Sequence, residues 1–202
     1  MFFEQPTWIL SKIYPKGVFR KNPEDHSVYL TFDDGPIPEV TPWLLETLDS
    51  YGIKATFFVV GDNVRKYPEL YEMIINRGHR IGNHTFNHVR SMHMRNPDFI
   101  DNVQKCDNWF QTRLFRPPHG IMRRWSYRYM QESYDIIFYD VVTRDYSSRL
   151  SPEKVLGIVK KYTRNGSIIV FHDSLKSEKN LKVVLPKAID WLTEQGYTFK
   201  LL

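Results

Sequence analysis

The sequence predicts an α/β fold with a parallel sheet, and three observations favour this class. Short runs of β-branched, aromatic and aliphatic residues recur along the chain, as expected of strands that are buried on both faces. Segments with apolar residues at helical spacing separate these runs, which is typical of parallel strands joined by right-handed crossovers. The 202 residues, 42% of them hydrophobic and 25% charged, suffice for one domain with a sizeable core.

The first half of the chain contains an N-terminal extension, residues 1–27, and then three predicted strands. The first strand runs from Val28 to Phe32 and ends at a group of strong turn residues. A helix over "PEVTPWLLETLDSYG", which stops at Gly52, precedes the strand "ATFFVV". A second helix, which reaches about Arg77, precedes the short strand "HRIGN".

The second half continues the alternation and brings the number of predicted strands to seven. Its strands are "LFR", "YDIIFYDVV", "SIIVFH" and the closing "YTFKLL". Helices are expected over about 97–112, near 122–132 and over about 180–195, and another begins at the Ser-Pro-Glu signal of "SPEKVLGIVKKYT". Whether such a sheet closes into a barrel or stays open, function collects at the carboxyl ends of its strands.

Charge and composition argue against several classes of protein. The net charge is +5, but no zinc-finger spacing, RNA-recognition motif or lysine-rich tail supports nucleic-acid binding. No apolar run has the length of a signal-peptide core or a membrane span, so a protein that starts at Met1 is expected in the cytoplasm. Cys106 is the single cysteine, which excludes an internal disulfide, and its apolar neighbours predict a buried thiol. The oligomeric state stays open.

Polar residues with distinctive chemistry follow five of the predicted strands. Because the carboxyl ends of parallel strands share one edge of the sheet, we expect these residues on one rim. Three of the seven histidines belong to the set, which favours a functional site over ordinary turn chemistry. The set comprises Asp33, Asp34, His84, His88, Arg116, Asp145, His172 and Asp173.

Two histidines of this set have the spacing of metal ligands. His84 and His88 are four residues apart, so on one helical turn both imidazoles can face the same point. A carboxylate from the first strand completes three protein ligands and leaves positions open for water and substrate, as in catalytic zinc sites. The same set can hold ferrous iron, cobalt or nickel. One of the two aspartates is then a ligand, and its neighbour is free to act as a base.

Several of these residues also have ordinary structural explanations. "DDGP" alone is typical of a solvated turn in which Asp33 caps a helix, and Asp173 can cap another turn. His79 and His93 have no partner pattern, so solvated or capping positions are expected for them. An aromatic stripe at helical spacing is expected in the core rather than as a sugar platform; it consists of Met122, Trp125 and Tyr129.

Five motifs, in chain order, resemble those of a known family. "TFDDGP", "HTFNH", "RPPHG", "TRDY" and "VFHD" are similar to the motifs of carbohydrate esterase family 4, the polysaccharide deacetylases with the NodB homology domain. The resemblance runs from about Val28 to the carboxyl terminus, so we treat residues 1–202 as one such domain. It implies a distorted (β/α) barrel, TIM-barrel-like but with fewer than eight strands. It also implies a divalent metal, usually zinc, and the removal of acetyl groups from N-acetylated sugars.

The resemblance implies the metal ligands and the general base. Asp34, His84 and His88 would hold the metal ion. Asp33 would be the general base, and Arg116 would position it. These roles are physically consistent, because a neighbouring arginine favours the ionised form of a carboxylate.

The resemblance also implies the general acid and the contacts to the substrate. His172 would protonate the leaving amine, and Asp145 would orient it and favour its protonated form. A backbone N–H near Pro118 and His119 would help to bind the developing oxyanion, a contribution of ~3–4 kcal/mol for a typical donor of this kind. Tyr146 is the candidate for stacking on a sugar.

Two positions depart from the usual family pattern. His119 stands where tyrosine is usual, and Val142 stands where an aspartate is common before "RDY". Any residue except proline supplies the backbone donor, so we expect His119 to fill the place of the tyrosine. We expect Val142 to face the core, with little cost to catalysis.

The sequence thus predicts a metal-dependent hydrolase that acts on the amide of an N-acetylated sugar, either in a glycan or in a small acetylated sugar. Two alternatives stay open. One is an amidase on the same fold that acts on a non-sugar amide, and the other is a carbohydrate-binding protein without turnover. Pure binding needs neither a base nor an acid, so Asp33 and His172 argue against the second alternative.

Overall fold

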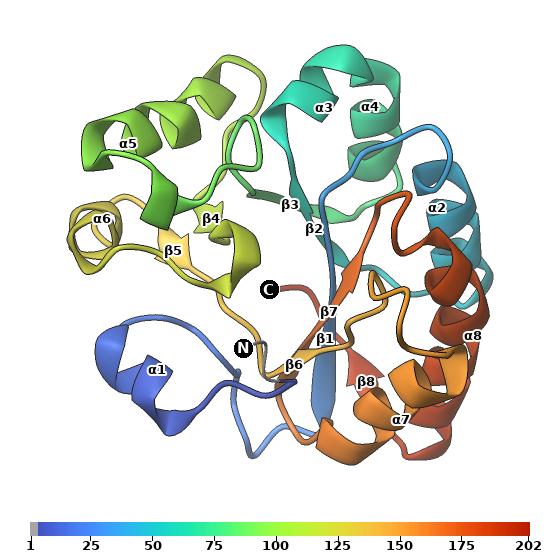
Figure 1. Ribbon diagram of the computed structural model, residues 1–202. Helices are drawn as coiled ribbons and strands as arrows, with labels where there is room; N and C mark the ends of the chain where they lie inside the picture. The colour runs from blue at the N-terminus through green and yellow to red at the C-terminus, as the bar shows by residue number, and fades with distance from the viewer. Residues whose placement is uncertain (1–3) are drawn as a thin grey trace.

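The computed structural model describes residues 4–202, which form a curled half-barrel of parallel strands with helices on its outside (Figure 1). Seven strands follow the order β5-β4-β3-β2-β1-β7-β6, and β8 lies beside the first residues of β1. The predicted α/β barrel-like fold is therefore confirmed. The strands are β1 (Ser27–Asp33), β2 (Thr56–Val59), β3 (Arg80–Asn83), β4 (Leu114–Phe115), β5 (Asp135–Ile136), β6 (Val141–Val142), β7 (Ser167–His172) and β8 (Thr198–Phe199).

The helices lie close to their expected places, with two corrections. The helix that was expected to reach Arg77 is two helices, because Pro68 starts a new one and cannot continue the old one. The helix expected over 97–112 ends at Gln104 and continues only as a short 3₁₀ turn. The α-helices are α1 (Trp8–Ile13), α2 (Thr41–Ser50), α3 (Gly61–Lys66), α4 (Pro68–Asn76), α5 (Asn96–Gln104), α6 (Arg124–Met130), α7 (Pro152–Tyr162) and α8 (Glu178–Glu194).

The fifth predicted strand, residues 134–142, is divided between the two edges of the sheet. Its start, β5, pairs with β4, and its end, β6, pairs with β7. The residues between them carry hydrogen bonds across the gap: the amide of Phe138 donates to Val18, and the amide of Asp140 donates to Ile168. One apolar run therefore closes the curl, because its backbone changes partners from one edge to the other.

Alternation along β1 separates a helix-facing core from the interior of the curl. Val28, Leu30 and Phe32 belong to the core that α2, α7 and α8 cover, on the right of Figure 1. Tyr29 belongs to the opposite face, where it packs with Phe58, Ile168 and the carboxyl-terminal Leu202. The interior is thus filled by side chains up to the level of Thr31, and Asp33 lies at its upper end.

Several expectations about individual residues can be checked against burial. Cys106 is fully buried, as expected, and His93 is exposed. His79 is buried rather than solvated, because its Nδ1 accepts the amide hydrogen of Ala55. Of the stripe that was expected in the core, only Met122 is buried. The rings of Trp125 and Tyr129 stack on each other at the surface, and about half of each residue is exposed.

None of the helices in the described part of the chain combines the length and the apolar character that a membrane crossing requires.

Candidate functional site

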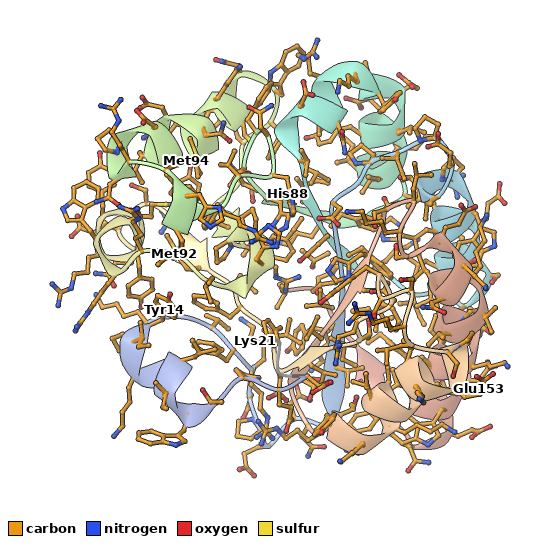
Figure 2. The ribbon with its side chains drawn as sticks, viewed as in Figure 1. Tyr14, Lys21, His88, Met92, Met94 and Glu153 are labelled. Atoms are coloured by element: carbon orange, nitrogen blue, oxygen red, sulfur yellow. The ribbon has the colours of Figure 1, made fainter. Side chains whose placement is uncertain are left out.

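A cavity of about 310 Å³ opens at the carboxyl ends of the strands. Loops that follow β1, β3, β4, β6 and β7 all contribute to its lining, which is the convergence that the parallel sheet predicts. Figure 2 places His88 near the centre of the view, in the loop after β3. The volume of the cavity is at the lower end of the range for small-molecule sites, ~300–1,000 Å³.

Three potential metal ligands converge at one side of this cavity. One ligand atom from each of Asp34, His84 and His88 lies within 4.8 Å of the others. Oδ1 of Asp34 lies 3.2 Å from Nε2 of His88 and 3.7 Å from Nε2 of His84, yet no hydrogen-bond donor is aligned with it in the described structure. A buried carboxylate oxygen without a partner beside two imidazole nitrogens fits a divalent cation.

The two histidines do not share a helix, contrary to the expectation from their spacing. Residues 84–88 form a loop in which Thr85 and His88 have positive φ angles of 65° and 53°. Two asparagine side chains hold this loop. Oδ1 of Asn83 accepts a hydrogen bond from the backbone amide of Thr85, and Oδ1 of Asn102 accepts hydrogen bonds from the backbone amides of Phe86 and Asn87. The spacing brings the rings together through a folded turn, because these local hydrogen bonds replace the helical ones.

The hydrogen bond of His84 determines which of its nitrogens faces Asp34. Nδ1 donates to the carbonyl oxygen of Arg116 at 2.8 Å, and a carbonyl can only accept. Burial lowers the pKa of His84 to about 4, so the ring is neutral near pH 7 and Nε2 carries a lone pair. Burial opposes ionisation of Asp34, but the neighbouring His88, His172 and His84 lower its pKa. Both groups are therefore in the form that a metal ion requires.

Asp33 contacts an arginine with Oδ1, and its other oxygen, Oδ2, lies 3.9 Å from Nε2 of His84. Nη1 of Arg116 donates to Oδ1 of Asp33 at 2.7 Å and to Oγ1 of Thr31 at 2.8 Å. Nη2 donates to the carbonyl of Phe138, and the guanidinium lies 4.0 Å from the centre of the Phe58 ring. The arginine is almost completely buried and held on several sides, so it presents a fixed positive charge to one carboxylate.

His172 and Asp145 form the second close pair of the cavity. Nδ1 of His172 donates to Oδ1 of Asp145 at 2.7 Å, and the His172 amide donates to Oδ2. Burial alone would lower the pKa of His172, but the charge and hydrogen bond of Asp145 raise it to about 9. Asn180 donates to the carbonyl of Asp145 and ties this loop to α8. His172 is therefore protonated at neutral pH.

The three residues expected to contact substrate lie in different positions. His119 and Tyr146 line the cavity, whereas Pro118 is buried beside it. His119 has a positive φ of 64°, and its ring lies 5.0 Å from that of His88. Burial and the nearby His88 and Arg90 lower the pKa of His119 to about 4, so it adds no positive charge near pH 7.

The expectations about two neighbouring positions have different outcomes. Val142 is buried, as expected, and it also lines the cavity, because β6 pairs with β7 at the edge of the curl. Asp173 is no turn cap: it is completely buried and accepts a hydrogen bond of 2.6 Å from Thr41. Gly35 lies so close to it that an added Cβ would meet Oδ2 of Asp173 at 2.1 Å. Asp173 thus packs directly beneath the turn that carries the two aspartates.

Sequence reasoning missed several residues of the cavity wall. Arg90, Tyr139 and Lys176 line it, together with Gly120 and Ser174. Arg90 and Lys176 lie two and four residues after the predicted site residues His88 and His172, so proximity in the chain was the available signal. Tyr139 carried no such signal, because it lies inside the run that was expected to be one continuous strand.

Comparisons with known proteins point in one direction. A family model described as polysaccharide deacetylase matches residues 20–134. The chain is 31% identical over 180 residues to a peptidoglycan-N-acetylglucosamine deacetylase of Bacillus cereus, which covers 85% of this chain and 84% of the relative. It is 30% identical over 179 residues to a chitooligosaccharide deacetylase of Bradyrhizobium sp. (strain ANU 289), which covers 81% and 80%.

A solved structure agrees with these relatives. The crystal structure of the Bc1960 peptidoglycan N-acetylglucosamine deacetylase, in complex with 4-naphthalen-1-yl-N-oxidanyl-benzamide, matches with a TM-score of 0.90 and 27% sequence identity. The match covers 98% of this chain and 95% of that one. Fold, family model and relatives all agree with the resemblance drawn from the five motifs.

Proposed function

The chain belongs to the polysaccharide deacetylase family, carbohydrate esterase family 4, and we propose that it hydrolyses the acetamide of N-acetylated sugars with the help of one divalent metal ion, zinc in the first instance. Sugar N-deacetylation is the activity that the names of the relatives carry. The residues that perform it here are assigned on the geometry of the cavity.

One observation carries the assignment: a carboxylate paired with an arginine and a histidine paired with an aspartate line the same cavity as the potential metal ligands. The Asp33–Arg116 and His172–Asp145 pairs each have a contact of 2.7 Å, and Asp145 raises the pKa of His172. A carboxylate that can accept a proton and an imidazolium that can donate one therefore line the same cavity. Hydrolysis of an amide needs both, because water must lose a proton and the amine must gain one.

Each protein group then has one task. Asp34, His84 and His88 would hold the divalent cation, which would supply Lewis-acid polarisation of the acetyl carbonyl and of water. Asp33 takes the proton from the attacking water, and Arg116 keeps Asp33 in place. The backbone amide of His119 is our candidate donor to the developing oxyanion.

The leaving amine is protonated by His172, at the other wall of the cavity. His172 donates its proton to the amine nitrogen as the carbon–nitrogen bond breaks, and Asp145 stabilises the protonated ring before the transfer. Tyr146 lies with its ring edge-on to that of His172, 4.7 Å between ring centres, so it is placed to contact the sugar beside the reacting amide. The products are acetate and a free amino sugar.

The test is acetate release from N-acetylglucosamine oligomers and from peptidoglycan fragments, measured on protein that has been stripped with a chelator and reloaded with one equivalent of zinc. We expect activity only after reloading, and cobalt, nickel or ferrous iron in place of zinc provides the comparison. Stripped protein with full activity would contradict the metal assignment. Tight binding of the oligomers without acetate release would favour a carbohydrate-binding protein, and release of acetate only from non-sugar amides would favour the amidase alternative.

A further inference from the structure

Two positively charged side chains stand at the mouth of the cavity on opposite walls. Arg90 belongs to the loop after β3, beyond His88, and Lys176 belongs to the loop after β7, beyond His172. In the sheet, β3 and β7 lie on opposite sides of β1. Both residues line the cavity and both are exposed.

The protein does not neutralise these two charges. Within residues 4–202, no carboxylate lies within ion-pair distance of the side chain of Arg90 or of Lys176. Neighbouring cations are paired: Arg144 contacts Glu4 at 2.7 Å, and Lys182 contacts Glu178 at 2.6 Å. Arg90 and Lys176 thus differ from these two cations, whose charges are already compensated by carboxylates.

The carboxylates of the cavity lining are engaged elsewhere. The acidic residues among its described lining are Asp33 and Asp34. Asp33 is paired with Arg116, and Asp34 faces the two histidines on the floor. The upper part of the cavity therefore carries two positive charges and no negative one, and the charge of Arg90 acts on the His119 ring at the rim.

A neutral sugar offers these cations only hydroxyl and carbonyl oxygens, whereas an anionic substituent on the sugar also offers a charge and accepts stronger, charge-assisted hydrogen bonds. We propose that the acetylated sugar taken by this cavity, or the sugar next to it, carries an anionic group, a carboxylate or a phosphate, that is held between Arg90 and Lys176. The inference rests on the proposed deacetylase function and names the class of glycan on which it acts. Each exposed pair of this kind contributes ~0.2–1 kcal/mol, a factor of roughly 1.5 to 5 in affinity.

The test compares three oligosaccharides of equal length that differ at one acetylated sugar: unsubstituted, with a carboxylate-bearing ether, or with a phosphate ester. Acetate release and calorimetric binding are measured for each, at low and at high salt. We expect at least one anionic oligosaccharide to have a kcat/KM roughly tenfold above that of the neutral one, with the advantage shrinking at high salt because exposed charges are screened. The anionic oligosaccharide with the higher kcat/KM shows whether the natural group is a carboxylate or a phosphate.

Charge-neutral variants show which residues cause the preference for anionic oligosaccharides. Arg90→Gln and Lys176→Gln are each expected to reduce the anionic-to-neutral ratio about threefold, and the double variant is expected to bring it close to one. Lys179→Gln is the matched control, because Lys179 is exposed on the same segment but lies outside the cavity lining, and the ratio should not change. Equal kcat/KM for neutral and anionic oligosaccharides, or a preference that survives in the double variant, would overturn the inference.

The outcomes also separate this inference from the proposed function. Tighter binding of the anionic oligosaccharide without acetate release from any of the three would support the anion site and contradict the deacetylase. Acetate release at equal rates from all three would support the deacetylase function and contradict the anion site.

Discussion

At the scale of single residues, the neighbours Asp33 and Asp34 face different partners because the strand ends between them. Asp33 keeps the alternation of β1 and points inward, above Thr31 and beside Arg116. Asp34 leaves the strand with a φ of +83°, a conformation that aspartate tolerates better than most residues, and its carboxylate turns to His84 and His88. The two adjacent carboxylates thus have different nearest partners, although Oδ2 of Asp33 also lies 3.9 Å from Nε2 of His84.

This difference predicts opposite effects of two similar substitutions. Asp33→Asn should keep bound zinc nearly intact and lower turnover by roughly 10²–10⁴, because the base is lost but the ligands are not. Asp34→Asn should lose the metal first. Metal content by elemental analysis and acetate release measure both effects, with Asp62→Asn, a partly buried ion-pair residue outside the cavity lining, as the control. Loss of metal from Asp33→Asn and its retention by Asp34→Asn would require the two roles to be exchanged.

The His172–Asp145 pair predicts how turnover depends on pH. His172 holds its proton below its pKa of about 9, so the acid is available there and is lost as the pH rises through that value. A dication nearby repels the proton, so the basic limb of kcat/KM should lie at or below about pH 9. His172→Ala should remove this limb and slow an acetamide more than a phenyl acetate ester, since a phenoxide leaves without an acid. Unchanged amide turnover in this variant would show that another group is the acid.

At the scale of elements, the pairing of β2 with β3 supports the arginine of the site. Phe58 and Gly82 are paired residues of these strands, and an added Cβ on Gly82 would meet the Phe58 ring at 2.4 Å. The same ring lies against the guanidinium of Arg116. The absence of a side chain at Gly82 therefore sets where Phe58 lies, and Phe58 in turn limits where Arg116 can lie.

Gly82→Ala is expected to destabilise the fold and to reduce turnover together. Overpacking at this position should lower the free energy of unfolding by ~1–3 kcal/mol, because Phe58 has to move within a filled interior. Urea unfolding and acetate release at saturating substrate measure the two effects. Gly157→Ala is the matched control: its Cβ meets nothing within 4 Å on α7, so a gain of up to ~1 kcal/mol and unchanged turnover are expected. A Gly82→Ala protein as stable and active as the parent would contradict the packing argument.

At the scale of the whole molecule, the half-barrel is completed by segments far apart in the sequence. Residues 137–140 cross between the two edges of the sheet, and Val18 bridges to Ile137. Phe138, in this crossing, stacks on Tyr14 at 4.7 Å and on Phe19 at 4.6 Å. It thereby joins the N-terminal segment to a further hydrophobic cluster, which contains residues of α5 and α6 such as Phe99 and Tyr127. Figure 1 shows α1 at the lower left, next to this junction.

Phe138→Ala should therefore affect the whole fold and the N-terminal segment at once. Loss of a fully buried ring should lower the free energy of unfolding by ~3–5 kcal/mol. It should also make residues 4–20 more sensitive to proteolysis, because two of their aromatic contacts disappear. Leu175→Ala, which truncates a side chain that is 62% exposed, should change stability by less than about 0.5 kcal/mol. An N-terminal segment that stays protected in Phe138→Ala would show that other contacts hold it.

The class of fold and the candidate site could be predicted from the sequence, because both depend on local patterns. Apolar runs and helical spacing identify strands and helices, and a parallel sheet brings the residues after its strands to one edge. For this reason Asp33, His84 and His172 could be expected together in one cavity, as the structure places them.

Features that depend on partners distant in the sequence could not be predicted and are seen only in the folded chain. The apolar character of residues 134–142 indicates a strand, but it does not indicate which strands pair with its two ends, so the change from one edge of the sheet to the other was not predicted. The exposure of Trp125 was not predicted, because helical spacing marks a face of a helix but not what covers that face. The burial of His79 was not predicted, because its hydrogen-bond partner, the amide of Ala55, lies 24 residues away in the sequence. The unpaired charges of Arg90 and Lys176 follow from which side chains the fold leaves beside them, and packing decides that.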